Sequence, residues 1–164
     1  MIFALSEHSH GATNAVSHEL DDGTTLHWEV LDQAPSDALL AAKIELDPGA
    51  GWLLRCDRVD FPPGGIAYRH THPGPGIRYL LFGSIRIESG GETHEYRPRE
   101  PWFESGPEPV FAAASETGQS AFVRAMLLPS EWAGRRTIRY VDPLDEEKPK
   151  LQRATVFSEQ PVAL

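Results

Sequence analysis

The stretch that decides the fold runs from residue 64 to residue 83 and reads GGIAYRHTHPGPGIRYLLFG. Its two halves, residues 66–72 and 77–82, are rich in the aromatic and β-branched side chains that favour strands. The prolines and glycines between them mark a turn. Side chains two residues apart on a strand point to the same face, so His70 and His72 project together. The stretch therefore predicts two strands joined by a turn, with a pair of imidazoles on one face.

Short strands separated by turn residues continue on both sides of this stretch. Fourteen glycines and fourteen prolines interrupt the chain, and long runs with the 3.6-residue period of a helix are scarce. We expect further strands at residues 15–20, 24–31, 52–61, 84–89, 92–96, 110–114, 121–128 and 154–157. We also expect a strand or a short helix at 38–46, a short helix at 130–134, and a loosely held segment at 1–15. Many short strands with frequent turns predict a sandwich, a jelly roll or a barrel.

The size and charge of the chain limit its organisation and its partners. A chain of 164 residues predicts one domain, with a barrel core at about residues 50–130. We expect residues 140–164 to form an arm that packs on the barrel or on a partner subunit. The net charge of −9 argues against nucleic acids and anionic membranes as partners. The single cysteine excludes an intrachain disulfide, and the sequence shows neither a secretory signal nor a membrane span, so we expect a cytoplasmic protein.

The spacing of the glycines and histidines resembles the first motif of the cupin superfamily. Gly64, five residues, His70-x-His72, three residues, position 76, six residues and Gly83 match that motif in frame. The segment from residue 102 to 110 is similar to bacterial single-domain cupins near their second motif. This resemblance implies an all-β, cupin-type double-stranded β-helix, which is a jelly-roll barrel, with one short C-terminal helix.

The same resemblance implies a metal site, but the ligand set is incomplete here. The family takes two histidines and a glutamate from the first motif and a third histidine from the second. In this chain Gly76 stands at the glutamate position and Val110 at the third histidine position. His70 and His72 alone hold a divalent ion such as Fe, Mn, Ni or Zn weakly, unless water, substrate or a carboxylate such as Glu104 completes the set.

Arg78 is the second residue that the resemblance singles out. Strand alternation places Arg78 on the same face as Gly76, and the family counterpart of position 76 faces the barrel interior. A buried guanidinium needs a partner, and the candidates are an internal carboxylate such as Glu104 or an anionic ligand. A register slip would instead point Arg78 outward. Tyr68 shares the parity of His70, so it either lines the same cavity or packs in the core.

Three functional hypotheses stay open at this stage. In the first, the pocket binds a small carboxylate or similar anion, with Arg78, Tyr68 and Glu104 contacting it and His70 and His72 as hydrogen-bonding or acid–base groups. In the second, the chain is a metal-dependent dioxygenase or isomerase in which the two histidines hold the metal. In the third, the barrel is a non-catalytic dimerisation scaffold. We expect a homodimer in each case, and the sequence leaves open whether any turnover occurs.

Overall fold

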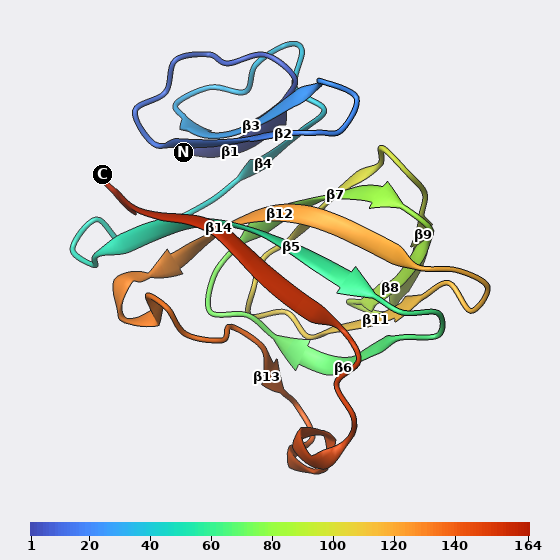
Figure 1. Cartoon of the computed structure of the whole chain (residues 1–164). Helices are drawn as coiled ribbons and strands as arrows, with labels where there is room; N and C mark the ends of the chain where they lie inside the picture. The colour runs from blue at the N-terminus through green and yellow to red at the C-terminus, as the bar shows by residue number, and fades with distance from the viewer.

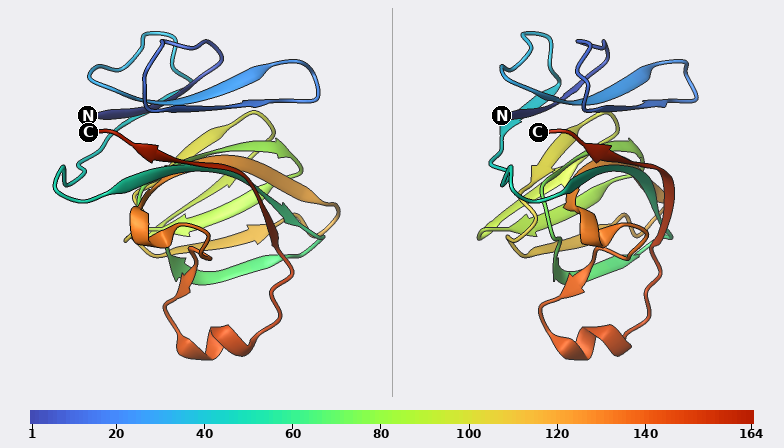
Figure 2. Two further views of the ribbon diagram at one scale, coloured as in Figure 1. Left: turned by 60° about the vertical axis from the view of Figure 1, so that its left-hand side comes forward. Right: turned by 90° about the vertical axis from the view of Figure 1, so that its left-hand side faces the viewer.

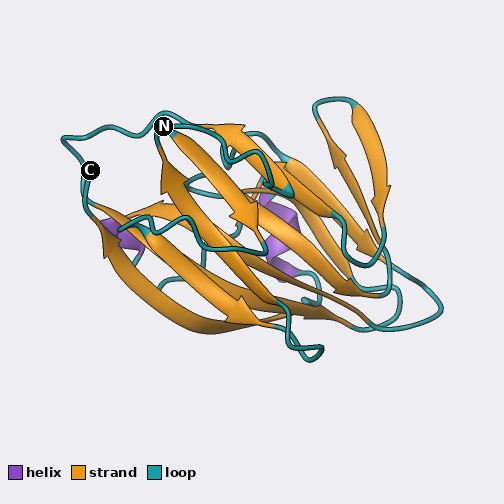
Figure 3. Cartoon of the chain, turned by 90° about the horizontal axis from the view of Figure 1, so that it is seen from above, coloured by secondary structure: helices purple, strands orange, loops and turns teal.

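The computed structural model describes residues 1–164, and antiparallel strands dominate it (Figures 1 and 3). Eight strands form the central unit: β5 (Trp52–Phe61), β6 (Ile66–Thr71), β7 (Gly76–Phe82), β8 (Ile85–Ser89), β9 (Glu92–Tyr96), β10 (Pro101–Glu104), β11 (Val110–Ala114) and β12 (Ser120–Pro129). One sheet pairs in the order β10-β7-β12-β5 and the opposite sheet in the order β6-β11-β8-β9. The chain changes sheet at every connection except the β8–β9 hairpin. This is the strand order of an eight-stranded jelly roll, so the predicted all-β jelly-roll fold is confirmed.

A third sheet covers the outside of the first one (Figure 2). It contains β1 (Ile2–Ser6), β2 (Ala15–Glu19), β3 (Thr25–Leu31) and β4 (Leu40–Lys43), in the order β2-β3-β1-β4. Phe3 and Leu5 of β1 are fully buried and pack against the outward-facing residues of β5, β7 and β12. The prediction that residues 1–15 are loosely held is therefore wrong. The run of polar residues that follows β1, from Glu7 to His10, hides this strand in the sequence.

The extra sheet explains why β5 and β12 are buried on both faces. Their outward side chains, among them Leu54, Cys56 and Leu127, join the large apolar cluster beneath the N-terminal sheet. Their inward side chains point into the barrel. A second apolar cluster, which includes Phe61, Ala114 and Phe122, lies inside the barrel. Buried charged side chains, among them Arg78, Arg124 and Asp57, share the interior with it.

The C-terminal segment extends both sheets of the barrel. After the 3-10 turn η1 (Ser130–Trp132), β13 (Arg139–Tyr140) pairs with β6. A second 3-10 segment, η2 (Pro143–Glu147), leads to β14 (Arg153–Val162), which pairs with β5 of the same chain (Figure 1). The expected short helix is thus present as η1, and the arm packs on its own barrel. No helical segment in the structure is long and apolar enough to cross a membrane.

Candidate functional site

The barrel interior and the C-terminal arm enclose a cavity of about 580 Å³. Its 25 lining residues combine an apolar wall with an unusual number of charges. Seven lining residues are basic and three are acidic: Arg55, Arg78, Arg124, Arg135, Arg136, Lys150 and Arg153 against Asp57, Glu104 and Glu159. A protein with a net charge of −9 and only 15 lysines and arginines thus places nearly half of its basic residues around one cavity.

His70 and His72 both line this cavity, as their spacing on one strand predicts. Each side chain is 5% exposed, and the two ring centroids lie 4.9 Å apart with the rings nearly perpendicular. The Nδ1 atom of His70 donates to the backbone carbonyl of Tyr68 at 2.6 Å, because a carbonyl oxygen can only accept. The Nε2 atom of a neutral His70 is therefore left as an acceptor.

The surroundings of both histidines favour the neutral ring. Burial lowers the pKa of His70, although Glu104 partly opposes that effect. Burial also holds the pKa of His72 well below its usual value, and the positive charges of Arg124 and Arg78 lower it further. The His72 Nδ1 atom lies 3.2 Å from the hydroxyl of Thr137. Both side chains thus present uncharged imidazoles to the cavity near neutral pH.

Arg78 points inward and forms an ion pair with Glu104. Its side chain is 1% exposed, and its Nη2 atom lies 2.6 Å from Glu104 Oε2. Its Nη1 atom donates to the carbonyl of Gly76 at 2.8 Å, while the indole of Trp102 donates to Glu104 Oε1 at 2.9 Å. Burial lowers the pKa of Arg78 to about 10, with Glu104 opposing the shift. The structure therefore gives Arg78 an internal carboxylate partner. The alternative that a register slip points Arg78 outward is wrong.

The glycine at position 76 makes room for this guanidinium. A Cβ atom on Gly76 would lie 2.8 Å from Arg78 Nη1, 2.8 Å from the Met126 side chain and 3.0 Å from the Ala125 carbonyl. A glutamate at position 76 and the observed Arg78 therefore cannot occupy this space together. In the β7–β10 register, Glu104 stands directly opposite Gly76. A carboxylate is present near the histidines, but it comes from the neighbouring strand and is bound to Arg78.

Two more buried arginines belong to the site, and the sequence analysis missed them. Arg124 binds Asp57 with two contacts, from Nε to Oδ1 at 2.7 Å and from Nη2 to Oδ2 at 3.2 Å. Arg55 pairs with Glu159 of β14 and donates to two backbone carbonyls of the segment that follows β12. The sequence signal that could have identified them is a charged residue inside an otherwise apolar strand, at a position whose side chain faces the barrel interior.

Tyr68 does not line the cavity, which corrects the expectation from strand alternation. In the β6–β11 ladder Val110 pairs with His70, whereas Ala112 pairs with Ala67. Two steps along β11 thus correspond to three steps along β6. This bulge reverses which side chains of β6 face the barrel interior. Ala67 faces the cavity instead, and the ring of Tyr68 lies outside it, 4.4 Å from Lys148 Nζ.

The residues at this site do not fit a resident divalent metal. No three or more histidine, cysteine, aspartate or glutamate side chains are grouped so that they could hold an ion. Glu104 is already bound to Arg78, and Val110 pairs with His70 at the place expected for a third histidine. The guanidinium groups of Arg78 and Arg124 also raise the positive potential around both imidazoles. These two guanidinium groups would repel a divalent metal ion placed between the imidazoles.

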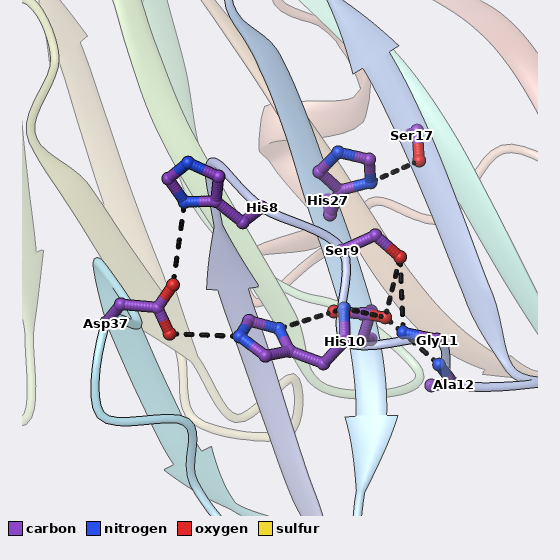
Figure 4. A network of polar contacts seen from close by, with 9 residues as sticks. His8, Ser9, His10, Gly11, Ala12, Ser17, His27 and Asp37 are labelled. Atoms are coloured by element: carbon purple, nitrogen blue, oxygen red, sulfur yellow. Dashed lines mark hydrogen bonds and ion pairs between the residues drawn. The ribbon is translucent and has the colours of Figure 1, made fainter.

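A separate polar network lies at the N-terminal sheet (Figure 4), and none of its residues lines the cavity. The His10 ring bridges two carboxylates, with Nδ1 2.9 Å from Glu29 and Nε2 2.9 Å from Asp37. Glu29 also accepts from the backbone N–H groups of His10 and Ala12. These hydrogen bonds raise the pKa of His10, because both ring nitrogens must donate to serve both acids. The network anchors the loop after β1.

Comparison with known proteins yields likenesses at the level of solved structures. No family model matches the chain, and no curated protein matches it. The polyketide cyclase RemF from Streptomyces resistomycificus shares 22% identity over 63% of this chain and 72% of its own, with a TM-score of 0.45. The DMSP lyase DddQ from Ruegeria pomeroyi shares 19% identity over 55% of this chain and 44% of its own, with a TM-score of 0.48. An RmlC-like cupin from Shewanella frigidimarina shares 17% identity over 52% of this chain and 83% of its own, with a TM-score of 0.41.

Proposed function

We propose that this jelly roll is a cupin-type barrel that binds a small organic anion, most simply a carboxylate, in the cavity next to Arg78 and the two histidines. The observation that carries the proposal is the concentration of basic residues there. Three arginines line the cavity as buried side chains, in a protein whose overall charge is strongly negative. Arginine binds carboxylates through a planar fork of N–H donors, and burial strengthens that interaction.

The internal ion pairs leave donors free for a ligand. A guanidinium has five N–H donors, and Arg78 has two protein partners, Glu104 and the Gly76 carbonyl. Arg124 is matched by Asp57 alone. His70 adds an acceptor at Nε2, and the same neutral imidazoles are the groups that would transfer protons if the bound molecule were turned over. The wall therefore supports recognition of an anion and its neighbouring polar groups.

The rim of the cavity also supports an anionic ligand. Arg135, Arg136 and Arg153 are exposed, and Lys150 is half-buried beside them. Glu159 on the rim is paired with the buried Arg55, and the nearby Glu146 pairs with Arg136 and Lys150, which leaves Arg135 and Arg153 without an acidic partner. The lining as a whole keeps an excess of positive charge, which draws anions toward the mouth.

A thermal shift series tests this function. We expect the unfolding midpoint of the wild-type protein to rise with millimolar carboxylates, because a ligand that binds only the folded state stabilises it. The variant Arg78→Met/Glu104→Gln removes the guanidinium without leaving a buried carboxylate unpaired, and the amide oxygen of the new side chain still accepts from Trp102. The matched control is Arg86→Met, at an exposed arginine outside the cavity. A full ligand response in the folded double variant, or none in the wild type, would overturn the proposal.

A further inference from the structure

The cavity has two levels, which are visible in the pairing of neighbouring strands. Across β7, β12 and β5, the paired residues Arg78, Arg124 and Asp57 form one row. The next inward-facing row of the same strands is Leu80, Phe122 and Val59. One step along the barrel thus replaces a charged row by an apolar one.

The opposite sheet has the same division. His70 lies against His72, whose Nε2 atom is 4.0 Å from Glu104, at the level of the charges. Ala67 pairs with Ala112 next to Ile87, and these three pack in one apolar cluster with Phe122 and Val59. The residues of this level that line the cavity, from both sheets, all carry hydrocarbon side chains: Val59, Phe122, Ala67, Ala112 and Ile87. Ten of the 25 lining residues are hydrophobic.

From this division we infer that the ligand is an amphipathic monocarboxylate, with an apolar body such as a phenyl ring and its carboxylate at the level of Arg78 and Arg124. The inference rests on the proposed function and adds the class of molecule. A cavity of about 580 Å³ is far larger than acetate needs and lies in the usual range for drug-sized ligands. A small carboxylate would leave the apolar level hydrated, so a hydrocarbon body gains affinity by displacing that water.

A single anionic group fits better than two. The charged level already contains the carboxylates of Asp57 and Glu104, which pair with Arg124 and Arg78. A second ligand carboxylate at the depth of Phe122 would find no donor, and an unpaired buried charge strongly disfavours binding. The apolar level thus disfavours a second carboxylate at that depth, and it also disfavours very small acids.

Four probes measured by calorimetry on the full chain test the inference: 3-phenylpropionate, acetate, glutarate and the uncharged 3-phenylpropan-1-ol. Each methylene buried contributes about fourfold in affinity, so we expect 3-phenylpropionate to bind at least about tenfold more tightly than acetate. Glutarate and the alcohol should also bind at least about tenfold more weakly than 3-phenylpropionate.

A matched pair of variants ties the preference to the apolar level. Ala112→Leu extends side-chain atoms into the cavity at that level, whereas Ala113→Leu faces the other way on the same strand. We expect Ala112→Leu to reduce 3-phenylpropionate binding to the level of acetate and Ala113→Leu to leave it unchanged.

The outcomes separate this inference from the proposed function. Acetate or glutarate binding as tightly as 3-phenylpropionate overturns the amphipathic ligand and leaves the anion site intact. Equal binding of the alcohol overturns the anion site, and no binding of any carboxylate overturns both. An unaltered preference in Ala112→Leu also overturns the inference, because the apolar level would then not contact the ligand.

Discussion

Substitution of Gly76 by alanine tests the packing that replaces the expected metal ligand. The added Cβ atom would lie 2.8 Å from Arg78 Nη1 and from Met126 Cγ, and 3.0 Å from the Ala125 carbonyl oxygen. The first two atoms belong to flexible side chains and can move, but the carbonyl oxygen belongs to a paired strand. Movement of the guanidinium also weakens its 2.6 Å contact with Glu104. Overpacking of this kind destabilises a core by about 1–3 kcal/mol, so we expect Gly76→Ala to reduce the free energy of unfolding by about 2 kcal/mol.

A double-mutant cycle shows whether Arg78 causes this loss. In the Arg78→Met/Glu104→Gln background the guanidinium and its partner charge are gone, so the same Gly76→Ala change should destabilise by about 1 kcal/mol or less. Urea unfolding followed by circular dichroism measures all four proteins. Gly118→Ala is the control, because a Cβ at that loop position has no neighbour within 4 Å. An equal loss in both backgrounds would refute the argument that Gly76 exists to accommodate Arg78.

The remaining predictions concern the charged and exposed groups. Arg124→Met leaves Asp57 buried without a partner and should destabilise by about 3–5 kcal/mol in urea unfolding, whereas Asp57→Leu/Arg124→Met should recover most of that loss. The raised pKa of His10 means that its bridge stabilises the fold below pH 6.5 and is lost as pH rises through the folded-state pKa. A His10→Gln variant should therefore lose more stability at about pH 6 than at about pH 8, and an equal loss would contradict the bridge. We also propose a homodimer that covers the exposed side chain of Leu144 in the arm; Leu144→Glu should shift sedimentation toward the monomer, and an unchanged dimer would reject the arm as the interface.

The barrel was predictable from the sequence because its signals are local. Turn residues and alternating side chains in residues 52–61, 66–72 and 77–82 specify strands, and their frequency specifies an all-β fold. The N-terminal strand β1 (Ile2–Ser6) escaped prediction because its five residues become a strand only when β3 and β4 pair on either side. Its burial depends on contacts with residues far along the chain, which no local pattern contains.

The site was predictable only in part, for a reason that the strand register makes clear. Alternation correctly placed His70 with His72, and Arg78 with Gly76, because no irregularity lies between the two residues of either pair. Parity failed for Tyr68, because a bulge between it and His70 is set by pairing with β11. The ion pair of Arg124 with Asp57 depends on the pairing of β12 with β5. That pairing is a property of the strand topology, which the local sequence pattern does not contain.

The departures from the cupin motif are better understood as one arrangement than as separate losses. With glycine at position 76, the guanidinium of Arg78 has space beside the strand, and Glu104 on the paired strand neutralises it. Relative to the motif that the sequence resembles, Gly76 and Val110 stand at two ligand positions, and the guanidinium of Arg78 lies beside Gly76. Burial keeps both histidines neutral, and the positive charges of Arg78 and Arg124 disfavour the imidazolium further. A cavity so composed attracts negative charge, and a change at any one of these positions should weaken the fit of the others.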